Sequence, residues 1–92
     1  MSNNEELIKK AKIEEIAEKG AKIYEKIKIK YEPQYNGKFL AIDVETEKEY
    51  LGETSAEALE LARKEHTNKI FYVVKIGFAV AETMAQAIGS IH

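Results

Sequence analysis

Cysteine and tryptophan are absent from this 92-residue chain, and proline, aspartate and arginine each occur once. The lack of cysteine excludes disulfide bonds, thiol catalysis and zinc sites built from thiolates. A secreted domain of this size would usually need such cross-links, so we expect a cytoplasmic protein. The longest apolar run, residues 70–74, is far too short to span a bilayer, so we expect no membrane association.

The motifs of common active sites are also missing. No glycine-rich phosphate loop occurs, and His66 and His92 have no partner at ligand spacing. Asp43 and Glu45 share one face of a predicted strand and could form an acid/base or metal pair. Exposed hairpin faces commonly carry such charges, which also discourage edge pairing. We therefore expect no catalytic residue, no metal site and no cofactor, and hence no enzyme.

The residues that are present indicate one globular domain, since 45% are hydrophobic and 33% are charged. The net charge is −2 at neutral pH. Lysines are interleaved with glutamates along the first third of the chain, which cancels the positive field that phosphate backbones require. This pattern argues against a nucleic-acid partner.

Apolar residues recur every three or four positions in the N-terminal third and predict a helix over residues 12–31. The stripe consists of Ile13, Ile16, Gly20, Ile23 and Ile27. Gly20 is either a site of close backbone packing or a tolerated weak point. Pro33 ends the helix. Residues 1–11 do not continue the stripe, so we expect a flexible N-terminal segment there.

Three alternating segments predict strands at residues 38–45, 49–51 and 70–76. The second helix should begin with a capping box, Thr54 as N-cap and Glu57 reaching back, and run to about residue 65. Residues 78–92 form a tail for which a short helix and a frayed end both remain open.

The order α-β-β-α-β predicts an α+β domain over residues 12–77. The first two strands should form an antiparallel hairpin, and a right-handed crossover should place the third strand beside the first. We therefore expect a three-stranded, mainly antiparallel sheet of order 2-1-3, with both helices on one face.

The third strand, residues 70–76, gives the most specific prediction. Its residues are apolar on both faces, yet the order 2-1-3 places it at an edge, where it would be an aggregation hazard. Either the tail or the first helix covers it, or a second copy pairs with it. We predict self-association through this last strand, with an interface made of Ile70, Phe71, Tyr72, Val73 and Val74.

Residues 35–77 resemble a family of short microbial proteins classed as a domain of unknown function. The resemblance rests on a G-K-[FY]-[LV]-A strand, a [TS]-x-x-E-A helix and a closing [IV]-[FY]-x-V-[KR]-I-G strand. These motifs correspond to Gly37-Lys38-Phe39-Leu40-Ala41, Thr54-Ser55-Ala56-Glu57-Ala58 and Ile70-Phe71-Tyr72-Val73-Val74-Lys75-Ile76-Gly77. They specify a fold and carry no chemistry. The resemblance implies an antitoxin-like or regulatory partner protein and transfers no site residue.

Two functions follow as hypotheses. The first is a small non-enzymatic interaction or regulatory module, antitoxin-like in one form, that dimerises through its sheet and binds a protein partner. The alternative is a small-ligand or nucleic-acid binding domain that uses an open sheet face around Phe39, Ala41, Phe71 and Val73. The sequence itself names no partner and no ligand.

Overall fold

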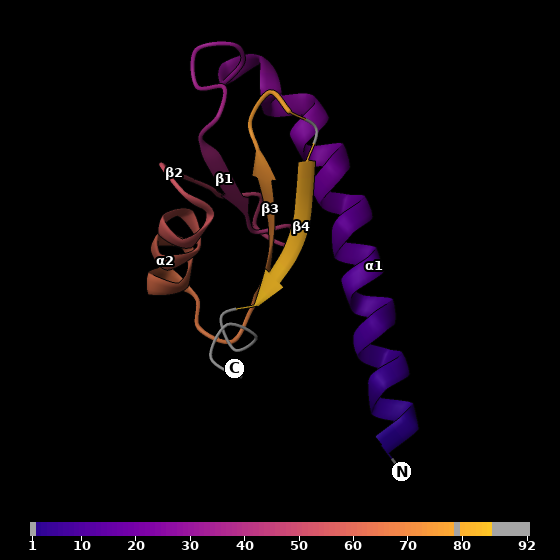
Figure 1. Ribbon diagram of the computed structural model, residues 1–92. Helices are drawn as coiled ribbons and strands as arrows, with labels where there is room; N and C mark the ends of the chain where they lie inside the picture. Colours follow the sequence, from indigo (N-terminus) through magenta and orange to yellow (C-terminus); the bar gives the residue numbers. More distant parts are fainter. Residues whose placement is uncertain (1, 79, 86–92) are drawn as a thin grey trace.

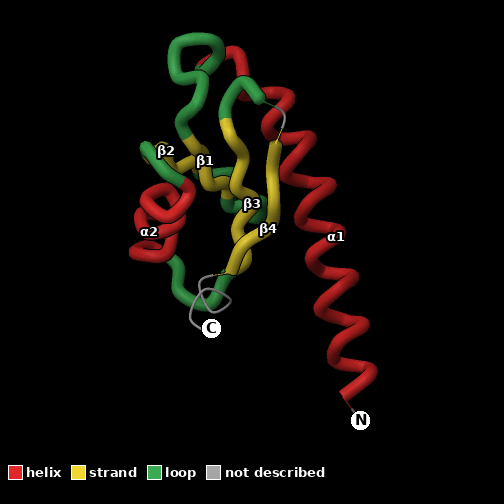
Figure 2. Tube along the Cα trace, in the orientation of Figure 1, coloured by secondary structure: helices red, strands yellow, loops and turns green. Residues whose placement is uncertain are grey.

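A computed structural model describes residues 2–78 and 80–85, with side chains described for residues 11–78. These residues form two α-helices and four strands (Figures 1 and 2). The elements are α1 (Ser2–Ile27), a short 3-10 helix (Lys28–Lys30), β1 (Phe39–Ile42), β2 (Glu49–Gly52), α2 (Ser55–Glu65), β3 (Ile70–Lys75) and β4 (Val80–Ala85). Within these residues, neither helix combines the length and the apolar character needed to cross a membrane.

The strands form one antiparallel sheet of order β2-β1-β3-β4. The predicted α+β class and the order 2-1-3 are confirmed, and β3 runs antiparallel to β1 as expected. The sheet is larger than predicted, because β4 adds a fourth strand beside β3.

β4 replaces the short helix considered for the tail. Gly77 has a φ of +84°, a left-handed conformation that glycine adopts without strain, and the chain reverses there. Val80 and Thr83 favour extended backbone, and residues 80–85 pair along all of β3. The expectation of a helix or a frayed end is therefore wrong for residues 80–85. Residues 86–92 of the predicted tail lie outside the described residues.

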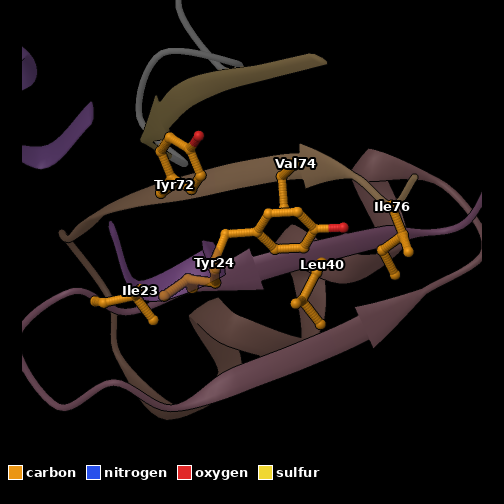
Figure 3. Packing of buried hydrophobic residues seen from close by; sticks show 7 residues of the cluster. Ile23, Tyr24, Leu40, Tyr72, Val74 and Ile76 are labelled. Atoms are coloured by element: carbon orange, nitrogen blue, oxygen red, sulfur yellow. The ribbon is translucent and has the colours of Figure 1, made fainter. Parts of the chain in front are cut away.

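The two helices cover opposite faces of the sheet, so the prediction that both lie on one face is wrong. On one face, Ile23 and Tyr24 of α1 pack against residues of β1 and β3, as Figure 3 shows for Tyr24 near Leu40 and Val74. On the other face, Ala58 and Ala62 of α2 pack against the same two strands. β3 is apolar on both faces, and each face needs its own cover to be removed from water.

α1 begins at Ser2, so the segment predicted as flexible, residues 1–11, is helical over the part that the structure describes. The helix ends at Ile27 and continues as the short 3-10 helix, earlier than the predicted end at residue 31. In Figure 1 the N-terminal part of α1 extends past the end of the sheet. The molecule is accordingly elongated, with extents of 48 × 23 × 21 Å.

Gly20 is a site of close helix–sheet contact, which resolves the two interpretations of this residue. It is buried, and a Cβ atom added to it would lie 2.1 Å from Cγ of Tyr72. No real Cβ atom approaches another carbon so closely. The absence of a side chain therefore lets α1 approach β3.

α2 begins as predicted. The Thr54 hydroxyl accepts a hydrogen bond of 3.1 Å from the Glu57 N–H, which confirms Thr54 as the N-cap. The Glu57 carboxylate reaches back to the N–H of Glu53, at 2.6 Å, one residue before the expected position. This start places the end of α2, and with it His66, beside the turn that follows β1.

Candidate functional site

Asp43 directly follows β1 and organises the turn to β2. Only 2% of the residue is exposed. Its Oδ1 accepts hydrogen bonds from the backbone N–H groups of Glu45, at 3.0 Å, and of Thr46, at 3.4 Å. Its own N–H donates to the carbonyl of Lys48, at 3.0 Å, so the residue also extends the ladder between the two strands. An aspartate side chain that binds the backbone two and three residues ahead is a standard way to close a turn.

The second carboxylate oxygen of Asp43 contacts a lysine and a histidine side chain. Lys69 Nζ lies 2.9 Å from Oδ2 and His66 Nε2 lies 3.6 Å from it. Lys69 also contacts the exposed carboxylate of Glu45, at 3.0 Å. Asp43 and Glu45, which the sequence placed on one strand face, are therefore joined through one lysine. His66 is at a helix end, as predicted, and its contact with Asp43 was not foreseen.

The electrostatics of this cluster suit a structural role. Burial acts to raise the pKa of Asp43, but the hydrogen bonds from Lys69 and from two backbone amides outweigh it, and the pKa is lowered. The hydrogen bonds to Asp43 and Glu45 raise the pKa of Lys69. A general acid or base works best with a pKa near the working pH, and both shifts move away from it. Among the described residues, no three acidic or histidine side chains are arranged to hold a metal ion.

A cleft of about 200 Å³ lies beside this cluster, between α1 and the end of the sheet. Its walls are Lys12, Glu15, Ile16 and Lys19 of α1 and residues 43–45 and 68–70. Glu15 is paired with Lys19 at 3.2 Å, and both acidic residues of the opposite wall are paired with Lys69. The cleft is therefore open, with both charged and apolar residues in its walls, and its charges are internally balanced.

Three tyrosine–glutamate pairs join neighbouring segments elsewhere in the fold. The Tyr24 hydroxyl donates to Glu32 at 2.6 Å, and Tyr31 and Tyr50 donate to Glu49 and Glu65. Burial and the adjacent carboxylate raise the pKa of Tyr24 and of Tyr50 to about 12 and also raise that of Tyr31. Tyr24 is buried, Tyr31 and Tyr50 are half-buried, and all three hydroxyl groups are committed to intramolecular bonds.

The predicted interface at residues 70–74 is in the centre of the fold. Phe71, Tyr72, Val73 and Val74 are buried and Ile70 is half-buried. The backbone edge that was expected to be free pairs with β4 along its full length. Of the two ways of covering β3 that the sequence left open, the tail is the one observed. The reason for predicting self-association through β3 is thereby removed.

The open sheet face predicted as an alternative binding surface is also covered. Ala41, Phe71 and Val73 are at most 2% exposed beneath α2, and Phe39 is half-buried beside them. A ligand or nucleic-acid site on this face would need α2 to leave it. The expectation that this face is open is therefore wrong, while binding of a small ligand or nucleic acid stays an untested prediction.

The outer edge of β4 is a structural feature that the sequence did not predict. β4 ends the strand order, and within the described part of the chain β3 is its one pairing partner. We call this backbone row, residues 80–85 on the side away from β3, the β4 edge. A row of unpaired N–H and C=O groups on a sheet edge can pair with another strand. Extended residues after the turn at Gly77 were the signal available in the sequence.

The hydrogen-bond pattern shows which residues form the β4 edge. The Ile76 N–H donates to the Lys38 carbonyl, so even-numbered residues of β3 direct their backbone groups toward β1. Phe71, Val73 and Lys75 therefore direct theirs toward β4, where they are opposite Met84, Glu82 and Val80. The alternate residues Ala81, Thr83 and Ala85 direct their N–H and C=O groups outward.

No family model, curated protein or solved structure matches the chain. The resemblance to a family of short microbial proteins therefore stays a prediction.

Proposed function

We propose that the protein is a non-enzymatic interaction module that recruits a partner chain by strand addition at the β4 edge. The outward backbone groups of Ala81, Thr83 and Ala85 carry this proposal. Each can exchange hydrogen bonds with an extended segment, and this main-chain pairing supplies the affinity in known strand-addition complexes.

The other surfaces of the described residues offer fewer free groups for binding, which supports this choice. Both sheet faces are packed under helices. The polar side chains of the Asp43 cluster and the three tyrosine hydroxyls already have intramolecular partners. A binding function without new chemistry therefore fits the molecule better than catalysis does. A regulatory, antitoxin-like module would be one form of this function, since such a module acts by holding a protein partner.

The experiment compares the wild-type chain with an edge-blocked variant as bait. Thr83→Pro removes one outward N–H, and proline is tolerated on the outer side of an edge strand. Ile29→Ala is the matched control, because Ile29 is 83% exposed and lies in the short 3-10 helix, outside the sheet. We expect a partner that the wild type and Ile29→Ala retain and Thr83→Pro loses, with the partner protecting the Thr83 amide from exchange. A partner held equally by all three baits would contradict the proposal.

The cleft beside Asp43 supports a second candidate function, binding of a small polar ligand. Its walls present both ammonium and carboxylate groups around a volume of about 200 Å³. A thermal-shift screen with amino acids, nucleotides and divalent metals tests this function on the wild type. The variant Lys19→Ala tests whether a ligand binds in the cleft, because Lys19 lines the cleft and is exposed. A shift that Lys19→Ala leaves unchanged would place the ligand elsewhere.

A further inference from the structure

We infer that the partner at the β4 edge is a second copy of this chain, paired antiparallel about a two-fold axis at Thr83. The result is one continuous eight-stranded sheet. This inference rests on the proposed function, because it uses the same edge and names the occupant.

The outward groups of β4 complement themselves. In an antiparallel pair of identical strands, hydrogen-bonded residues must both direct their groups across the seam. A two-fold axis at Thr83 places Thr83 opposite Thr83 of the second copy, and Ala81 opposite its Ala85. All three outward residues of each copy are then paired, and each pair exchanges two hydrogen bonds.

The neighbouring register is less favourable for two reasons. A shift of the axis to residue 82 leaves Ala85 without a partner inside the strand, because its mate becomes residue 79. It also places Glu82 opposite Glu82 of the second copy, and like charges directly opposite each other are destabilising. With the axis at Thr83, Glu82 is opposite Met84. Glu82 is the one charged residue in β4, so this register removes the main repulsion.

The other edge of the sheet is protected from such pairing. β2 is four residues long, and the pairing of Asp43 with Lys48 makes Glu49 and Leu51 its outward positions. Glu49 is charged and is already bound to Lys30 at 3.2 Å and to Tyr31. Short edges that carry charge resist strand addition. The β4 edge is six residues long, and its outward positions, Ala81, Thr83 and Ala85, are uncharged residues.

α1 has the same position relative to the seam in both copies. It contacts β3 and β4, and its residues Ile23 and Tyr24 pack on the sheet face formed by β1 and β3. A two-fold axis perpendicular to the sheet leaves both α1 helices on the same face, antiparallel to each other.

Sedimentation and light scattering on the full chain test the inference. We expect the wild type to have twice the chain mass of 10.4 kDa and to dissociate on dilution. Thr83→Pro removes two interchain hydrogen bonds, so its dissociation constant should rise by about ten- to a hundredfold. Glu82→Pro is the matched control, because it removes an inward N–H and should destabilise the pairing of β3 with β4 instead.

A mixed dimer of labelled and unlabelled chains gives a readout that needs no variant. Glu82 and Met84 of the two copies form a non-hydrogen-bonded pair in the proposed register, so their Hα atoms should show an interchain NOE. A wild type that is monomeric at every concentration, or a dimer without this NOE, overturns the inference. If the chain is monomeric but an edge-dependent partner is found by the bait experiment, the proposed function stands and only the second copy is wrong. If all three baits of that experiment hold the partner equally, the proposed function itself is contradicted.

Discussion

Asp43, the only aspartate in the chain, joins three segments: the turn after β1, the end of α2 and the start of β3. The sequence showed it as a charged residue on a hairpin face. Its burial could not be predicted, because the alternation of the strand gave it the same face as the exposed Glu45. In the fold, Asp43 is paired with Lys69, which is distant in the sequence, and no local pattern encodes that contact.

The lowered pKa of Asp43 predicts a pH dependence of stability. A carboxyl group whose pKa is lower in the folded state stabilises the fold above its unfolded pKa of about 3.9. That contribution is lost as the pH falls through the folded pKa. Asp43→Asn should therefore reduce the free energy of unfolding by about 1–3 kcal/mol at neutral pH, with the difference from the wild type shrinking in acid. Urea unfolding across the acid range measures it.

Glu45→Gln is the matched control for Asp43→Asn. Glu45 contacts the same lysine but is exposed, and exposed ion pairs contribute about 0–1 kcal/mol. Its effect should be small at every pH. If Glu45→Gln costs as much as Asp43→Asn, or if the Asp43→Asn difference does not shrink in acid, the structural role of Asp43 is wrong.

At the scale of elements, the strong periodic patterns in the sequence were sufficient to predict the helices and strands, and the weak ones were not. The first three strands, the capped start of α2 and the order 2-1-3 follow from alternation, capping residues and the right-handed crossover. The start of α1 was missed because residues 2–11 do not continue the apolar stripe. β4 was missed because its two alanines fit a helix as well as a strand.

Gly20 gives a prediction about how α1 meets the sheet. In an exposed helix, Gly→Ala is stabilising by about 1 kcal/mol. Here the added methyl group would collide with the ring of Tyr72, so Gly20→Ala should instead lower the stability, by about 1–3 kcal/mol. Thermal or urea unfolding measures the sign.

The double variant Gly20→Ala/Tyr72→Val separates the collision from other causes. Valine is shorter and favours strands, so in this background the helix propensity of alanine should prevail, and Gly20→Ala should become neutral or stabilising. An equal cost in both backgrounds would show that the close approach of Gly20 to Tyr72 is not the reason.

At the scale of the whole molecule, β3 is apolar on both faces, and other segments of the same chain cover it. α1 and α2 cover its two faces, and β4 covers its edge. The sequence indicated that these surfaces needed cover, but it could not assign the cover, because each assignment depends on contacts between distant segments. Among the residues that the structure describes, the strand at this edge of the sheet is therefore β4 and not β3.

Amide hydrogen exchange at two adjacent residues of β4 tests the central claim, that the β4 edge is the binding surface. The Glu82 N–H is directed toward β3 and should be protected at every concentration. The Thr83 N–H is directed outward and should exchange freely in dilute protein, but become protected as concentration rises or a partner is added. Thr83 protection that does not change with concentration or partner, or binding that leaves the Thr83 amide exchanging freely, would contradict the account.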